Sequence, residues 1–301
     1  MKMRHIIILV LSVVVVFFGG FVHAADSAHT DSVQQQIKAL QAQIKSLQSL
    51  IANLKLQQEV PASSDVAAGS YLALDISNNT VISEKNAGQE YPIASITKLM
   101  NAVIAIENIN PSQQITLTKA MLQPLGYSPS IFEGLRVSAA DLLKASLIQS
   151  TNDAAESLAH FIGPEKFLDL MNQKAKDLGM HSTHFYDVHG LNIANHSSAS
   201  DLAILLAYIY RNHPEILTMS KDNDFWLPDP KGRLLKFKNV NNFYGSPEFI
   251  GGKTGYLLQA KQSLASVFFL NGKTVAIVVL YSKNRQADTL GIINRIKKII
   301  L

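Results

Sequence analysis

The chain contains no cysteine and few charged residues. The absence of cysteine excludes a disulfide framework, a cysteine nucleophile and thiolate metal ligands. Charged residues make up 17% of the 301 residues, and the formal net charge of +4 falls to +2 when Lys2 and Arg4 are set aside with the N-terminal segment. A balance this mild gives no reason to expect a nucleic-acid partner. Hydrophobic residues make up 47%, enough for one sizeable core or two smaller ones.

Residues 1–24 have the pattern of a secretory signal peptide. Lys2 and Arg4 precede a continuous apolar run at residues 6–18, and residues 22–24 provide a cleavage site of small residues. An uncleaved membrane anchor is the alternative, because the weakly apolar stretch continues to Val22, near the lower length limit for a membrane span. In either case we expect export, to the periplasm or to the outer face of the cytoplasmic membrane.

A heptad pattern in residues 25–59 predicts a coiled-coil helix. Ile at the a positions and Leu at most d positions favour a parallel two-stranded coil, but the flanking glutamines provide no ion pairs that would select a partner. We expect a homodimer or a partner protein to bind through residues 32–58; a lone spacer helix is the alternative, since the pattern is short. Residues 60–67 are predicted to be a linker. The apolar positions are Val33, Ile37, Leu40, Ile44, Leu47, Ile51 and Leu54.

Residues 68–301 are predicted to form one α+β domain. Strands at residues 70–76 and 80–85 flank Asn78-Asn79, and strands at 264–270 and 273–281 flank Asn271-Gly272, a strong hairpin signal. Strands are expected only near the two ends, which predicts an antiparallel β-sheet built from both chain ends with an inserted helical subdomain. The expected helices span residues 95–107, 139–161 with a corner at 150–152, 164–178, 200–210 and 287–301.

Ser95 and Lys98 stand three residues apart at the start of a predicted helix, where such side chains share a face. A serine hydroxyl needs a base, and a lysine becomes one when its pKa falls from ~10.4 toward neutrality, at a cost of roughly 4 kcal/mol. Burial, a helix N-terminus and a second lysine all lower such a pKa. Taken alone, this spacing occurs more often in an ordinary helix.

Two further motifs carry polar groups. Ser150-Thr151-Asn152 lies at the corner between helices, where a hydroxyl can relay a proton and an amide can bind a peptide group; helix capping by Ser150 is the alternative. Lys253-Thr254-Gly255 follows Gly251-Gly252, and these glycines suit a strand that approaches a ligand closely, although a solvated turn has the same composition. The order of the three motifs is more specific than any one of them.

In this order the motifs resemble those of the low-molecular-mass penicillin-binding proteins, which are serine-type D-alanyl-D-alanine carboxypeptidases and endopeptidases. The resemblance covers roughly residues 68–290 and includes residues 91–94, 152–155, 189–191 and 252–256. It implies a β-lactamase/transpeptidase-like fold. It also implies a hydrolase that acts on peptidoglycan stem peptides and takes part in cell wall biogenesis and the control of cell shape. A carboxypeptidase is expected first, and an endopeptidase that cuts cross-links is the alternative. The resemblance also implies acylation by β-lactam antibiotics and no cofactor.

The resemblance assigns roles to the first two motifs. Ser95 would attack the carbonyl carbon of the D-alanyl-D-alanine bond, and Lys98 would be its base. Ser150 would carry the proton to the leaving amine, and Asn152 would position Lys98 and the substrate amide.

The third motif would bind the substrate. Lys253 and Thr254 would hold the terminal carboxylate, and Gly255 belongs to the same strand. The backbone N–H groups of Ser95 and Tyr256 would form the oxyanion hole.

The sequence departs from the family pattern in two places. Thr151 stands where these peptidases most often have glycine, and residues 257–261 lack the glycine and arginine usual after the third motif. These departures leave the catalytic rate and the substrate choice open. The chain also has no match to the C-terminal β-domain and amphipathic anchor of many relatives, so we expect the N-terminal coil to take over their spacing or localising role.

Three other interpretations fit the sequence less well. His181, His184 and His189 suggest a zinc peptidase, but no His-Glu-x-x-His motif accompanies them, so no metal is expected. A class A β-lactamase needs a carboxylate-held water, and no clear Glu-x-x-Leu-Asn stretch occurs between Asn152 and Lys253. A weakly active peptidoglycan-binding scaffold is the non-enzyme alternative, which the intact motif residues disfavour.

Overall fold

The computed structural model describes residues 36–41, 43, 44, 66–123 and 130–299. The chain divides into two compact units, Met1–Gln48 and Ser49–Leu301. The predicted signal peptide and most of the predicted coiled coil and linker lie outside the described residues. Within the first unit, residues 36–41, 43 and 44 are helical, and Ile37, Leu40 and Ile44 are exposed.

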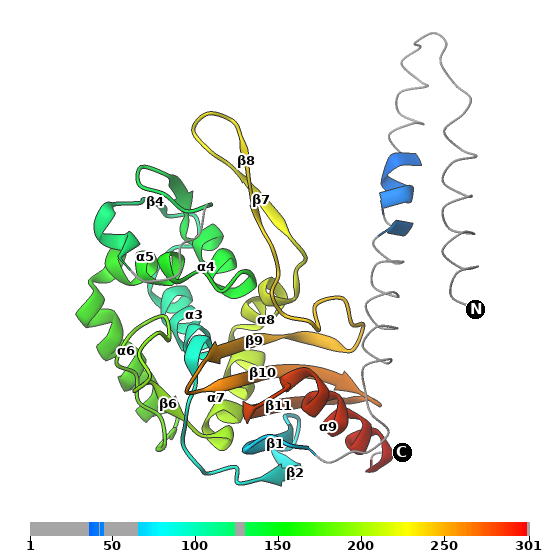
Figure 1. Cartoon of the computed structure of the whole chain (residues 1–301). Coiled ribbons are helices and arrows are strands. Elements are labelled where there is room, and N and C mark those ends of the chain that lie inside the picture. Colours follow the sequence, from blue (N-terminus) through cyan, green and yellow to red (C-terminus); the bar gives the residue numbers. More distant parts are fainter. Residues whose placement is uncertain (1–35, 42, 45–65, 124–129, 300–301) are drawn as a thin grey trace. The chain divides into compact units, whose positions relative to one another are not determined.

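The second unit is built around a five-stranded antiparallel sheet with the strand order β2-β1-β11-β10-β9 (Figure 1). β1 pairs with β11, so the first and last strands of the unit meet within one sheet. The hairpin residues Asn79, Asn271 and Gly272 all adopt positive φ, as tight turns between strands require. The predicted sheet from both chain ends is therefore confirmed. Its strands are β1 (Ser70–Asp75), β2 (Thr80–Lys85), β9 (Phe249–Leu257), β10 (Lys261–Leu270) and β11 (Lys273–Ser282).

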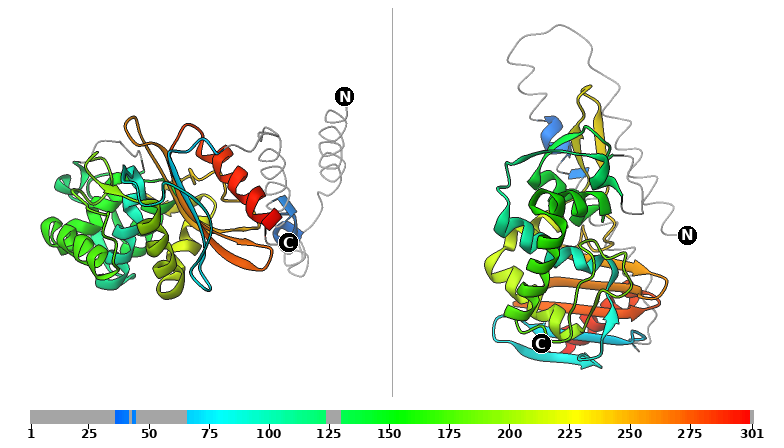
Figure 2. Two further views of the ribbon diagram at one scale, coloured as in Figure 1. Left: turned by 90° about the horizontal axis from the view of Figure 1, so that it is seen from below. Right: turned by 90° about the vertical axis from the view of Figure 1, so that its left-hand side faces the viewer.

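Both faces of the sheet are covered by helices (Figure 2). Successive side chains of β11 alternate between the faces: Val275 and Ile277 join the core beneath α9 (Arg285–Ile299), whereas Ala276 and Val278 join the core shared with the helical subdomain. The sheet is therefore fixed from both sides, which makes it a rigid support for residues at its edge. That edge is β9, the strand that carries Lys253-Thr254-Gly255.

The inserted subdomain contains the predicted helices with small shifts in their ends. The first begins two residues late, because residues 94–96 form a 3₁₀ turn. The last, predicted to end at Leu301, is described as far as Ile299. The eight-residue helix α8 was not predicted, since it is too short to show a clear apolar period. The helices are α3 (Thr97–Asn108), α4 (Ala139–Ile148), α5 (Asn152–Ile162), α6 (Pro164–Asp177), α7 (Ala199–Asn212) and α8 (Pro214–Lys221), with short 3₁₀ turns η1 (Ala94–Ile96) and η2 (Lys119–Leu122).

The expectation that strands occur only near the chain ends is wrong. Three small two-stranded sheets lie between the ends, and their strands of two to four residues are too short for a visible alternation of apolar and polar residues. They are β3 (Tyr91–Pro92) with β6 (His196–Ser197), β4 (Gln114–Thr116) with β5 (Arg136–Ser138), and β7 (Phe225–Pro228) with β8 (Leu234–Phe237). In the described part of the chain, no helix combines the length and apolar character needed to cross a bilayer.

Candidate active site

Ser95 lies on a strained turn between α3 and β9. The preceding residue, Ala94, is buried and has φ of 48°, a conformation that is costly for a residue with a Cβ atom. The Ile96 N–H donates to the Ile93 carbonyl oxygen (3.2 Å) and closes the turn. Ala94, immediately before Ser95, therefore takes a strained conformation that the surrounding structure must stabilise, and such residues are common at active sites.

Lys98 is the second residue of α3 and is fully buried. Its Nζ atom lies 3.1 Å from Ser95 Oγ, 2.7 Å from Asn152 Oδ1 and 2.5 Å from the carbonyl oxygen of His189. Burial lowers the pKa of Lys98 to about 7, while the negative charge of Asp187 opposes this shift. Lys98 is thus close to half neutral at pH 7, as a lysine that serves as a base must be.

Ser150 occupies the corner between α4 and α5. It has φ of 62°, which lets the chain reverse between the end of α4 at Ile148 and the start of α5 at Asn152. The Ser150 hydroxyl accepts a hydrogen bond from Lys253 Nζ (2.9 Å). Thr151, at the position where the family most often has glycine, buries a hydroxyl that has no hydrogen-bond partner among the described residues.

Lys253 is almost fully buried on the edge strand β9. Its Nζ atom also donates to the Thr254 carbonyl oxygen (3.0 Å). Burial lowers the pKa of Lys253 well below its ordinary value, and the nearby charges of Lys98 and Arg285 lower it further. Two lysines and an arginine therefore lie close enough to disfavour one another's charged forms, and an anionic group of a substrate would favour those charged forms.

Close packing explains why the third motif has glycine at position 255. A Cβ atom on Gly255 would lie 2.6 Å from the Ile93 carbonyl oxygen, so only glycine lets β9 approach the turn that carries Ser95 this closely. Arg285, at the start of α9, donates from Nη1 to the Gly255 carbonyl oxygen (3.2 Å). The neighbouring Tyr256 continues β9 with an exposed side chain. Arg285 was missed by the sequence analysis, because it stands 30 residues from Gly255 and outside any motif.

Asp187 organises the loop that supplies a carbonyl acceptor to Lys98. Its Oδ1 atom accepts hydrogen bonds from the backbone N–H groups of His189 (3.1 Å) and Gly190 (2.5 Å) and from Asn195 Nδ2 (2.9 Å). Its Oδ2 atom accepts one from the Asn192 N–H (2.5 Å). Residues 189–191 were expected here only as part of the family resemblance, and no role was predicted for Asp187.

The His189 side chain lies between two acidic residues behind Lys98. Its Nε2 atom is 3.6 Å from Glu156 Oε2, and its Nδ1 atom is 3.3 Å from Asp187 Oδ2. Burial lowers the pKa of His189 and raises the pKa of Glu156. In the described part of the chain, no group of three or more His, Cys, Asp or Glu residues is arranged to hold a metal ion.

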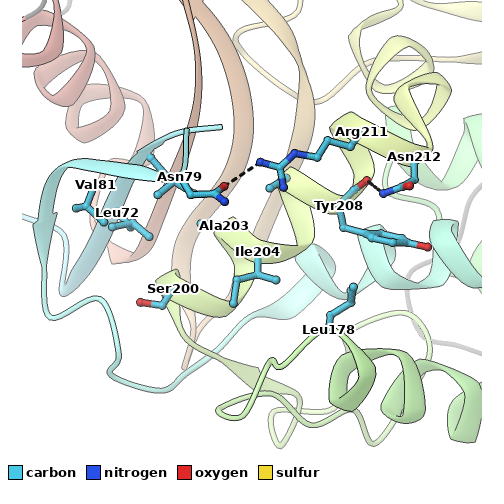
Figure 3. Close-up of a pocket in the computed structure, with 12 residues that line it drawn as sticks. Leu72, Asn79, Val81, Leu178, Ser200, Ala203, Ile204, Tyr208, Arg211 and Asn212 are labelled. Carbon is cyan, nitrogen blue, oxygen red and sulfur yellow. Dashed lines mark hydrogen bonds between the residues drawn. The ribbon is translucent and has the colours of Figure 1, made fainter. Parts of the chain in front are cut away.

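A separate apolar pocket of about 430 Å³ lies between the β1–β2 hairpin and α7 (Figure 3). Leu72, Val81 and Ile204 contribute to its lining, and Arg211 at its rim donates to Asn79 Oδ1 (2.9 Å). None of the motif residues lines it. The pocket is on the β2 side of the sheet, whereas the catalytic motifs gather at the opposite edge, β9.

The three motifs therefore form one centre. A serine lies beside a buried lysine, and a second lysine on β9 is hydrogen-bonded to a second serine at the corner between α4 and α5. This arrangement defines a serine acyl-transfer site of the penicillin-recognising class. A family model described as D-alanyl-D-alanine carboxypeptidase matches residues 56–284. The chain belongs to this family of serine DD-peptidases.

The curated relatives include both D-alanyl-D-alanine endopeptidases and D-alanyl-D-alanine carboxypeptidases. The chain is 33% identical to the D-alanyl-D-alanine endopeptidase of Haemophilus influenzae over 223 residues, 72% of this chain and 76% of that protein. It is 35% identical to the D-alanyl-D-alanine carboxypeptidase DacD of Escherichia coli over 173 residues, 53% of this chain and 45% of that protein.

Solved structures agree with the fold. The Streptomyces K15 DD-transpeptidase is 27% identical and superposes with a TM-score of 0.71, covering 79% of this chain and 98% of that one. The D-alanyl-D-alanine carboxypeptidase of Mycobacterium tuberculosis superposes with a TM-score of 0.73 over 80% of this chain and 96% of that one, and at 24% identity it supports the fold alone. The expected DD-peptidase fold is confirmed.

Proposed function

We propose that the enzyme cleaves D-alanyl-D-alanine-type bonds of peptidoglycan through an acyl-enzyme on Ser95. Ser95 Oγ bonds to the carbonyl carbon, the C–N bond breaks, and the leaving amine takes a proton. A water molecule then hydrolyses the ester and restores the hydroxyl. The observation that carries this proposal is the contact between Ser95 Oγ and the buried Lys98 Nζ, 3.1 Å apart.

The partners of Lys98 explain how a lysine serves as the base. Asn152 Oδ1 and the His189 carbonyl oxygen are acceptors only, so each takes an N–H bond from the amine. A neutral amine has two N–H bonds and one lone pair. When both N–H bonds donate to these acceptors, the lone pair faces the third neighbour, Ser95 Oγ. The Ser95 hydroxyl then donates to Lys98, which is the arrangement that proton removal requires.

Ser150 and Lys253 support the second half of the reaction. Lys253 donates to Ser150 Oγ, so the Ser150 hydroxyl proton is available to the leaving amine. Lys253 and Arg285, with the Thr254 hydroxyl, bind the substrate carboxylate beside β9, and the negative charge of the carboxylate favours the protonated form of Lys253. As an edge strand, β9 has backbone groups that can pair with a substrate, and we assign the oxyanion hole to the N–H groups of Ser95 and Tyr256.

The terminal D-alanine is the proposed leaving group, which makes the enzyme a carboxypeptidase. An endopeptidase that cuts cross-links is the second candidate. The coverage of the relatives favours this candidate. The alignment with this chain spans 76% and 72% of the endopeptidases of Haemophilus influenzae and Escherichia coli, but only 45% of the carboxypeptidase DacD of Escherichia coli.

Acylation by fluorescent penicillin tests the nucleophile, with Ser95→Ala as the control. We expect one label per chain, located on the Ser95 peptide by mass spectrometry, and none on the variant. An unlabelled parent protein, or a label that persists in Ser95→Ala, would contradict the proposal. Product analysis on isolated muropeptides separates the two activities, because a carboxypeptidase releases free D-alanine and an endopeptidase converts cross-linked dimers to monomers.

We also propose that residues 1–24 direct export, that residues 25–59 form a dimerising coil acting through residues 32–58, and that residues 60–67 link the coil to the peptidase domain at 68–301. Ile37, Leu40 and Ile44 support the coil, since they lie in a helical segment with 48%, 54% and 53% of their surface exposed and thus need a partner surface. N-terminal sequencing of the exported protein tests cleavage after Ala24. Light scattering on residues 25–301 tests dimerisation, and a monomer at micromolar concentration would refute it.

A further inference from the structure

The hairpin formed by β7 and β8 projects from the helical half of the domain as an arm (Figure 1). Its two faces differ in character. Cross-strand pairing places Trp226 opposite Lys236 and Pro228 opposite Leu234, and all four of these side chains are exposed. Trp226, the only tryptophan in the chain, is 50% exposed, and Leu234 is 68% exposed. The opposite face packs against the core through Phe225, Leu227, Leu235 and Phe237.

The inner face fixes the arm to α4. The rings of Phe225 and Phe237 stack with their centroids 4.7 Å apart, and the Lys144 ammonium of α4 lies 5.1 Å from the Phe225 ring. Lys144 also forms an ion pair with Asp222 (2.7 Å), just before β7. The arm is therefore a supported element with one free face.

The base of the arm is bonded to the corner that carries Ser150. The Val240 N–H donates to the Ile148 carbonyl oxygen (3.0 Å), and the Lys238 N–H donates to Gln149 Oε1 (3.1 Å). Ile148 and Gln149 immediately precede Ser150. The base of the arm is therefore attached to the active-site corner, within reach of a long substrate that extends past Ser150 from a scissile bond at Ser95.

The arm carries more basic than acidic side chains. Residues 224–238 include four basic and two acidic side chains. Both acids are already paired, Asp229 with Arg233 (2.7 Å) and Asp224 with Lys236 (2.8 Å). The two remaining lysines, Lys231 and Lys238, are exposed and have no acidic partner among the described residues.

We propose that the outer face of this arm binds polymeric peptidoglycan beyond the scissile bond. The Lys236 ammonium lies 5.3 Å from the centroid of the Trp226 ring, so a sugar ring of the glycan strand stacks on the opposite face of that ring. The carboxylates of neighbouring stem peptides pair with Lys231 and Lys238. This inference rests on the proposed function, because it takes the polymer from the substrate of the Ser95 site. The ligand is acidic and the arm is basic, and an exposed aromatic beside cations is the composition of a binding hot spot.

Binding is measured by co-sedimentation of the full chain with purified insoluble peptidoglycan, in a Ser95→Ala background that prevents turnover. We expect Trp226→Ala, and separately the Lys231→Glu/Lys238→Glu pair, to weaken binding by at least about fivefold. Phe269→Ala, which removes an aromatic ring that is 52% exposed on β10, controls for loss of ring surface. Lys166→Glu/Lys176→Glu on α6 controls for the change in net charge, and both controls should bind within about twofold of the parent.

The single tryptophan provides a second readout. Soluble glycan fragments added to the Ser95→Ala protein should change the fluorescence of Trp226, since no other tryptophan contributes. Unchanged fluorescence together with unchanged sedimentation of Trp226→Ala would overturn the proposal. The proposal would also be overturned if the arm variants lost binding to phosphatidylglycerol vesicles but kept their binding to peptidoglycan, because the arm would then be a membrane contact.

Penicillin labelling separates this inference from the proposed function. In chains that keep Ser95, the arm variants should be acylated within about twofold of the parent, since a small β-lactam does not reach the arm. Normal labelling also shows that the variants fold. If the parent is not labelled at all, the proposed function fails, and the sedimentation series still decides whether the arm binds the polymer.

Discussion

The ammonium nitrogen of Lys253 lies 2.9 Å from the hydroxyl oxygen of Ser150, although the two residues are 103 positions apart in the chain. This contact joins the helical subdomain to the edge of the sheet across the active site. It also places a second lysine beside the region of Lys98, and the charge of Lys98 helps to lower the pKa of Lys253. The chemistry of the enzyme therefore depends on how these two halves pack.

The first prediction concerns the pH dependence of acylation. The pKa of Lys98 is lowered to about 7, and only the neutral amine can accept the Ser95 proton. The second-order rate constant for penicillin acylation should therefore rise about tenfold per pH unit below pH 7 and level off above it. Stopped-flow fluorescence between pH 5 and 9 measures this profile. A rate that does not change across this range would remove Lys98 as the base, and Lys98→Ala should lose the acidic limb together with most of the rate.

The second prediction uses Asp187→Asn. The negative charge of Asp187 raises the pKa of Lys98 against the effect of burial, so its removal should lower that pKa. The acidic limb of the acylation profile should then move to lower pH, even though the lost loop hydrogen bonds also reduce the melting temperature. A lower amplitude with an unmoved midpoint would show a purely structural role. Asp169→Asn on the exposed side of α6 is the matched control and should leave the midpoint unchanged.

The third prediction compares two glycines. A Cβ atom on Gly190 would overlap the Ala94 carbonyl oxygen, and Gly190 has φ of 91°. Gly190→Ala should therefore lower the free energy of unfolding by more than about 3 kcal/mol and reduce acylation of Ser95. Gly88 has no neighbour within 4 Å of such an atom, so Gly88→Ala should be neutral or stabilising by up to about 1 kcal/mol. Urea denaturation of both variants measures the difference, and equal stabilities would contradict the close packing of this loop on the turn that carries Ser95.

The fourth prediction compares two buried threonines. Thr151 buries a hydroxyl without a partner among the described residues, so Thr151→Val should be neutral or stabilise by up to about 1 kcal/mol. The Thr97 hydroxyl accepts a hydrogen bond from Asn195 Nδ2 (3.0 Å), and Thr97→Val should cost about 1 to 2 kcal/mol. Thermal and urea unfolding give both values. A destabilised Thr151→Val would mean that this hydroxyl has a bound water or another partner in solution.

The sequence by itself determined the α+β class, the sheet from both chain ends and the order of the catalytic groups. Hairpin turns such as Asn271-Gly272 and the spacing of Ser95 and Lys98 are local, so their geometry follows from a few neighbouring residues. The short strands were not visible, because two to four residues show no period. They include β7 and β8, which form the proposed binding arm.

Only the tertiary structure decided the electrostatics of the site. The pKa of Lys98 depends on its burial and on Asp187, and the carbonyl of His189 reaches Lys98 across 91 positions of sequence. The Arg285 guanidinium contacts Gly255 across 30 positions. Desolvation and charge interactions act through space, over distances that chain order does not encode. The motifs therefore identify the reactive groups, whereas the packing of the helical subdomain on β9 determines their pKa values and hydrogen bonds.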